Sequence, residues 1–138
     1  MNNVEWLETF ELGVPEIDGD HRTIVDLMKA IEAALSAGHR KQAVRLIDRL
    51  VAFAEDHFRR EEALLVAWGY PEVTTHCQYH RGLVETVDRI KEACLEKGDT
   101  GSFEACCEEM MRYIVDDVVQ GDMHLKSYLQ YSDLVVTQ

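Results

Sequence analysis

Proline and glycine are scarce in this chain, with two prolines and eight glycines among 138 residues. Because these residues mark the turns of β-rich folds, their scarcity favours long helices. No apolar run approaches the roughly 18 residues that a membrane span requires. The N-terminal residues also lack the basic and apolar segments of a secretory signal. The sequence therefore predicts a helical, cytoplasmic protein that does not enter a membrane.

Basic residues are also few: 14 lysines and arginines stand against 26 aspartates and glutamates, a formal net charge of −12. This negative charge repels phosphates, which argues against binding to nucleic acids or anionic membranes. The four cysteines show no CxxC spacing, so we expect reduced, buried or half-buried thiols rather than a disulfide framework. They are Cys77, Cys94, Cys106 and Cys107.

The chain does contain four amphipathic stretches, in which apolar residues recur every three or four positions. They predict helices from just after Asp20 to Ser36, from near Arg40 to just before Gly69, from Thr74 or Thr75 to just before Gly98, and from Ser102 to at least Val119, with Gly121 loosening the helix beyond that point. Connections of about three to seven residues make consecutive helices antiparallel neighbours. We therefore predict an all-α fold, an up-down-up-down four-helix bundle.

The length is that of one ordinary domain, so residues 1–138 are expected to form a single domain. Residues 1–18, with Trp6, Phe10 and Pro15, are expected to form an N-terminal arm that covers part of the bundle. Residues 19–138 then comprise the bundle and a C-terminal tail.

Polar residues occupy positions that the helical periodicity assigns to the core. Burying an imidazole or a carboxylate without a partner costs several kcal/mol, so such residues are rare unless they are paired or bind a metal. One inward histidine is more often a hydrogen-bonded core residue, but four histidines and two carboxylates on several helices indicate a metal site. These six residues are His21, His57, Glu61, His76, His80 and Asp117.

Two spacings support this interpretation. His57 and Glu61 lie one helical turn apart, and so do His76 and His80. Residues at i and i+4 project from the same helix face, which suits two ligands on one metal or on adjacent metals. Imidazole mixed with carboxylate suits iron, manganese or zinc, and the lack of thiolate at these positions disfavours a structural zinc site.

The motifs that carry these residues resemble the bacterial hemerythrins over nearly the whole chain. The matching segments are Gly13–Arg22, His57-Phe58 with Glu61-Glu62, Tyr70-Pro71, and His76 with His80. The resemblance implies a non-haem di-iron centre that binds O₂, with two iron ions joined by an oxo or hydroxo bridge, or manganese in their place. It also implies that His21 and His57 hold one iron, which keeps an open position. His76, His80 and a fourth-helix residue would hold the other, and Glu61 and a fourth-helix aspartate would bridge the two.

The fourth helix departs from the family pattern, which has a histidine followed five residues later by the bridging aspartate. Asp122 falls on the bridging aspartate, and Asp117 falls where the histidine is expected. We predict that Asp117 is a direct ligand. Three alternatives remain: His124 reaches the centre through a bend at Gly121, water completes the coordination, or the site holds one metal only.

The leading hypothesis for function is an O₂-binding protein for storage, delivery or sensing, with an unidentified protein partner for signalling or delivery. One alternative is a di-metal oxidase or peroxidase, and another is a protein that responds to iron or nitric oxide. We assign no catalytic residues. Three apolar side chains are expected to keep water from the open position: Ile24, Phe53 and Phe58. Glu62 is expected to face water or to pair with a basic residue.

Overall fold

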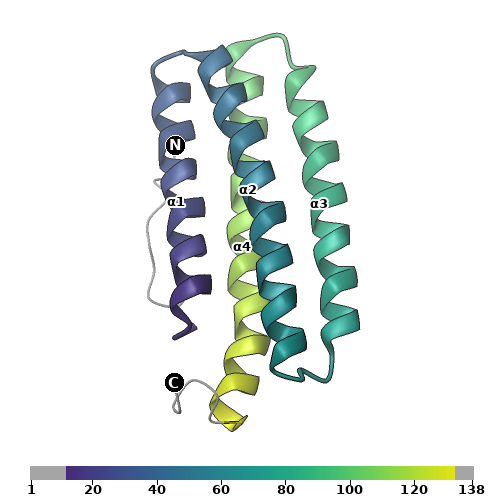
Figure 1. Ribbon diagram of the computed structural model, residues 1–138. Coiled ribbons are helices and arrows are strands. Elements are labelled where there is room, and N and C mark those ends of the chain that lie inside the picture. The colour runs from purple at the N-terminus through teal and green to yellow at the C-terminus, as the bar shows by residue number, and fades with distance from the viewer. Residues whose placement is uncertain (1–11, 133–138) are drawn as a thin grey trace.

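The computed structural model describes residues 12–132, apart from the side chains of 117–124, 126–127 and 129–132. Four long helices follow one another: α1 (Pro15–Ser36), α2 (Arg40–Ala67), α3 (Val73–Leu95) and α4 (Thr100–Ser132). Consecutive helices run in opposite directions and lie side by side, and α1 also packs against α4 (Figure 1). The predicted up-down-up-down bundle is confirmed.

The helix boundaries differ from the predictions at the starts of α1, α3 and α4; α4 begins at Thr100, before the predicted start at Ser102. Helix α1 begins at Pro15, earlier than expected, because proline at the first helical position needs no N–H partner and its fixed φ suits a helix. The Asp18 carboxylate accepts hydrogen bonds from the backbone N–H groups of Leu12 and Gly13, which fixes the chain just before the helix. Helix α3 begins at Val73, and its N-cap residue is Glu72 rather than a threonine.

Two other features of the helices concern glycine. Helix α4 continues through Gly121 to Ser132, beyond the loosening expected there. The turns after α1 and α2 each contain a glycine with positive φ, Gly38 at 75° and Gly69 at 70°. Glycine adopts this conformation without the steric cost that other residues incur, so both turns can be short.

The interior contains two apolar clusters, one on each side of the buried polar residues. The larger cluster spans all four helices and includes Met28, Leu50 and Met110, none of which is exposed to solvent. The smaller cluster, near the end of the bundle where α2 meets α3, includes Leu12 and Leu65. Leu12 is thus buried at this end of the bundle, while Trp6 and Phe10 of the expected arm lie outside the described residues and Pro15 belongs to α1.

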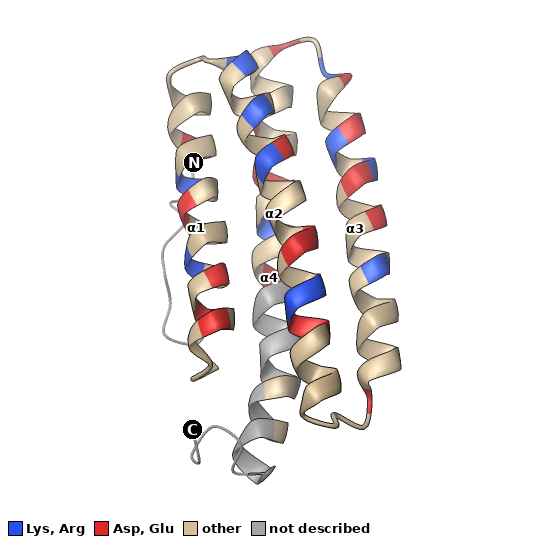
Figure 2. Ribbon diagram, viewed as in Figure 1, with Lys and Arg blue, Asp and Glu red and all other residues tan. Residues whose placement is uncertain are grey.

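Charged residues of both signs are interspersed along α1, α2 and α3 (Figure 2). Among the described residues, no helix has an apolar stretch long enough to cross a membrane.

The expectation that all cysteines are reduced thiols is wrong for one pair. Cys94 of α3 and Cys106 of α4 form a disulfide, with their Cα atoms 5.4 Å apart. They come together because the two helices are antiparallel across a short connection, a geometry that a search for CxxC motifs does not detect. Cys77 and Cys107 are free.

Candidate metal centre

Five polar or charged side chains are buried in the described part of the chain, and all five lie together. They are His21 on α1, His57 and Glu61 on α2, and His76 and His80 on α3. Each is one of the residues that the sequence predicted to face inward. The 3-4 spacing of the neighbouring apolar residues turns these positions toward the bundle axis, between the two apolar clusters.

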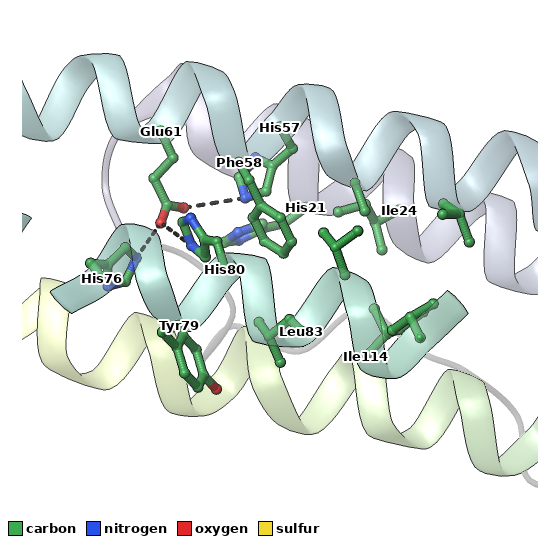
Figure 3. A pocket seen from close by; sticks show the side chains of 14 residues that line it. His21, Ile24, His57, Phe58, Glu61, His76, Tyr79, His80, Leu83 and Ile114 are labelled. Carbon is green, nitrogen blue, oxygen red and sulfur yellow. Dashed lines mark hydrogen bonds and ion pairs between the residues drawn. The ribbon is translucent and has the colours of Figure 1, made fainter. Parts of the chain in front are cut away.

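Glu61 contacts three of these four histidines (Figure 3). Its Oε2 atom lies 3.2 Å from Nε2 of His57, and its Oε1 atom lies 2.7 Å from Nε2 of His76 and 3.2 Å from Nε2 of His80. The ligand atoms fall into two groups, each suited in composition to hold a metal ion: His21, His57 and Glu61, and Glu61, His76 and His80. One carboxylate with its two oxygens turned to two groups of imidazoles is suited to bridge two cations.

Two of the histidines have a carboxylate at each ring nitrogen. Nδ1 of His57 lies 3.0 Å from Asp20, and Nδ1 of His80 lies 2.8 Å from Glu62, while Nε2 of each ring faces Glu61. A neutral imidazole carries one N–H, so it can donate a hydrogen bond at only one nitrogen. The second contact of each ring requires a cation, either a further proton or a metal ion between Nε2 and Glu61. The donor set therefore fits a metal.

The electrostatics of the cluster favour an ionised carboxylate at its centre. Burial opposes ionisation of Glu61, but its hydrogen bonds with three histidines hold the pKa of this carboxyl well below its usual range. Burial also opposes protonation of His57, yet the hydrogen bonds and charges of Glu61 and Asp20 outweigh burial and raise the His57 pKa. Glu61 thus places an ionised carboxylate at the centre of the cluster, a group that attracts a cation.

A cavity of about 50 Å³ adjoins the cluster. The five buried polar residues line one side of it, and apolar side chains such as Ile24, Leu83 and Ile114 line the other (Figure 3). By the same measure one water-sized group needs about 10–15 Å³, so a small ligand fits beside the cluster.

Of the three apolar residues expected near the open metal position, two line the cavity and one does not. Ile24 and Phe58 line the cavity, and the Phe58 ring stacks on His80 with ring centroids 4.0 Å apart. Phe53 does not line it; its ring packs against the larger apolar cluster and lies below the guanidinium of Arg60. Tyr79, which the sequence did not single out, does line the cavity.

The outer carboxylates are the main feature that the sequence interpretation missed. Glu62 is partly exposed, as expected, but its carboxylate also accepts a hydrogen bond from Nδ1 of the buried His80. Asp20 was not singled out, and it accepts from Nδ1 of His57 and from Arg60. Asp20 precedes His21 and Glu62 follows Glu61 in the chain, so each lies next to a predicted ligand. The histidine that each one contacts, however, lies on a different helix.

Three predicted residues of the fourth helix lie outside the described side chains: Asp117, Asp122 and His124. The backbone there belongs to the continuous helix α4.

An all-α bundle that encloses histidines and carboxylates around one shared glutamate defines a class of protein, the metal-binding four-helix bundles. A family model described as the hemerythrin HHE cation binding domain matches residues 12–126. The chain belongs to this hemerythrin family, as its motifs indicated. Membership implies binding of non-haem iron.

Curated relatives agree with this assignment. The chain is 28% identical over 82 residues to a bacteriohemerythrin of Stenotrophomonas maltophilia, a match that covers 59% of this chain and 54% of that protein. It is 31% identical over 93 residues to a bacteriohemerythrin of Clostridium acetobutylicum, covering 63% and 72%. A myohemerythrin of Theromyzon tessulatum is 26% identical over 93 residues, covering 67% and 72%.

Proposed function

We propose that this protein binds two iron ions in the bundle and uses them to bind O₂. Five described residues would hold the metals: His21, His57, Glu61, His76 and His80. We propose Asp117 and Asp122 of α4 as the remaining ligands, with Asp122 as a second bridge. The observation that carries the proposal is the position of Glu61, whose two oxygens face separate groups of histidines.

Iron bound here would supply the redox change that lets the protein take up O₂. The chain's own residues are arranged to hold the iron. The Nδ1 contacts of His57 and His80 leave Nε2 turned inward, and Glu61 supplies negative charge between the two groups. The apolar side of the cavity limits the access of water to the site.

The Asp117 assignment carries a consequence for the chemistry. A carboxylate in place of a neutral imidazole adds one negative charge beside the metal that His76 and His80 would hold. A unit charge about 4 Å away is worth about 4 kcal/mol at an effective dielectric of about 20. This charge favours the oxidised form of the centre, so O₂ uptake is expected to be fast and its return poor.

The test combines metal analysis with an anaerobic O₂ titration of the iron-loaded protein. Two irons per folded chain and one O₂ taken up per pair support the proposal, and a value near one iron contradicts the two-metal centre. Recovery of O₂ under vacuum indicates storage or delivery, whereas steady consumption of peroxide favours the oxidase or peroxidase alternative. Asp117→His should raise the reduction potential and improve the return of O₂.

A further inference from the structure

Two carboxylates outside the proposed ligand set contact histidines at Nδ1, the ring nitrogen opposite the one near Glu61. Oδ2 of Asp20 lies 3.0 Å from Nδ1 of His57, and Oε2 of Glu62 lies 2.8 Å from Nδ1 of His80. In both rings the opposite nitrogen, Nε2, lies 3.2 Å from Glu61. Each of these two histidines is therefore held between one outer carboxylate and the shared inner one.

An outer carboxylate has two effects on a histidine ligand. It accepts the Nδ1 proton, which fixes the tautomer and the ring orientation and leaves the Nε2 lone pair for the metal. It also makes the imidazole a stronger electron donor, and removal of such a partner typically weakens metal binding by about 10–100-fold.

The two outer carboxylates differ in how their charge is balanced. Arg60 contacts both oxygens of Asp20, with Nε 3.1 Å from Oδ2 and Nη2 3.0 Å from Oδ1. Among the described side chains, no lysine or arginine forms an ion pair with Glu62. Its other neighbour is the thiol of Cys77, a neutral donor whose pKa is raised by burial and by the hydrogen bond to Glu62. Glu62 thus has no lysine or arginine of the described structure paired with its carboxylate, whereas Arg60 pairs with both oxygens of Asp20 and offsets its charge.

Building on the proposed two-metal centre, we propose that Asp20 and Glu62 are positioning residues for His57 and His80. Because Arg60 neutralises Asp20 alone, the His80 imidazole is the stronger donor of the two. The metal held by His76 and His80 therefore binds more tightly and is taken up first, and the metal held by His21 and His57 is taken up second.

The first test is a titration of metal-free protein with Co²⁺ against a chromophoric chelator, which yields the affinity of each step. The wild type should bind two ions in two resolved steps. Glu62→Gln should weaken the first step by about 10–100-fold, and Asp20→Asn should weaken the second by a similar factor. Arg60→Met leaves the Asp20 charge unbalanced, so it should strengthen the second step severalfold. The difference in affinity between the two steps should therefore become smaller.

The matched control is Asp56→Asn. Asp56 lies on the same helix as Glu62 and pairs with Arg59 at the surface, and no histidine contact of this carboxylate is present in the described structure. This variant removes the same charge and one ion pair, and it should leave both steps unchanged. A loss of affinity in this control would mean that net charge, rather than the contact with a histidine, controls the affinity.

A second measurement reports the Nδ1 protons directly, and a residue with a merely structural role would not change it. In the Zn²⁺-loaded protein, long-range ¹H–¹⁵N NMR should show protons on Nδ1 of both His57 and His80. Glu62→Gln should shift the His80 Nδ1 proton upfield and speed its exchange with water, and leave that of His57 unchanged. Asp20→Asn should do the reverse.

The outcomes separate the two proposals. A wild type that binds fewer than two ions contradicts the proposed function itself. A wild type that binds two ions, with Glu62→Gln and Asp20→Asn at wild-type affinity in both steps, overturns only the positioning roles. If Asp20→Asn weakens the first step instead, the proposed order of metal uptake is overturned. The same holds if Arg60→Met does not reduce the difference in affinity between the two steps.

Discussion

Replacing Glu61 with alanine removes the one carboxylate that contacts three buried histidines. The Nε2 atoms of those histidines lie 3.2, 2.7 and 3.2 Å from its oxygens, and Glu61 is only 4% exposed, so bulk water cannot readily replace it. Removing one partner from a buried charged network costs about 3–5 kcal/mol. Glu61→Gln keeps the shape and one acceptor oxygen, so its cost should be nearer 1–3 kcal/mol, roughly the penalty for one unsatisfied buried group.

The effect on metal content should be larger than the effect on folding. Because Glu61 belongs to both groups of ligands, either substitution should reduce the proposed two metals per chain to none. His80→Ala alters only one group and should leave one metal. The contrast between a shared ligand and an unshared one is the outcome that the geometry predicts.

Two measurements check this prediction. Urea unfolding of the metal-free proteins, followed by circular dichroism, gives the change in the free energy of unfolding, and elemental analysis after reconstitution gives metal per folded chain. Glu85→Gln on the exposed face of α3 is the control and should change neither quantity. If Glu61→Ala kept two metals, or lost less than about 1 kcal/mol, the view of Glu61 as the shared carboxylate would be refuted.

Three further outcomes are expected. Serine at both Cys94 and Cys106, whose disulfide joins positions 12 residues apart, should lower the free energy of unfolding by about 3 kcal/mol; equal stability under reducing and oxidising conditions would contradict this. Burial raises the pKa of Cys107 to about 11, so at pH 8 about one thiol in a thousand is ionised, and iodoacetamide should label it only after unfolding. Ile24→Asn, which places a polar group in the cavity lining, should speed air oxidation of the iron-loaded protein, whereas Val66→Asn at the exposed surface should not.

The fold could be predicted from periodicity because apolar residues mark the inner face of every helix. Helix α2 begins at Arg40, as the spacing indicated, and ends at Ala67, within one residue of the predicted end just before Gly69. The starts of α1 and α3 were less accurate, since they depend on local contacts. At α1 the proline itself opens the helix, and Asp18 bonds backward to Leu12 and Gly13 instead of marking the end of an arm.

The inner part of the site was predictable for the same reason as the core. A buried polar residue interrupts an apolar stripe, and the cost of that interruption points to a partner or a metal. The outer carboxylates carry no such mark, because Asp20 and Glu62 lie at the boundary between interior and solvent, where acidic residues are common. Their contacts depend on how α1 and α3 are rotated against α2, and a single helix pattern does not contain that information.

The position of the site along the bundle also determines how far the stability of the fold depends on the metal centre. The polar cluster lies toward the end where α2 meets α3, whereas the disulfide joins α3 and α4 near the opposite end (Figure 1). Between them the larger apolar cluster contains fully buried side chains from all four helices, among them Met28, Leu50 and Met110. Burial of each such side chain contributes about 1.5–3 kcal/mol, and this contribution does not depend on a metal. Substitutions that empty the metal centre should therefore leave a folded bundle, and this makes metal content and the reactivity of the centre measurable in variants of every residue proposed to hold it.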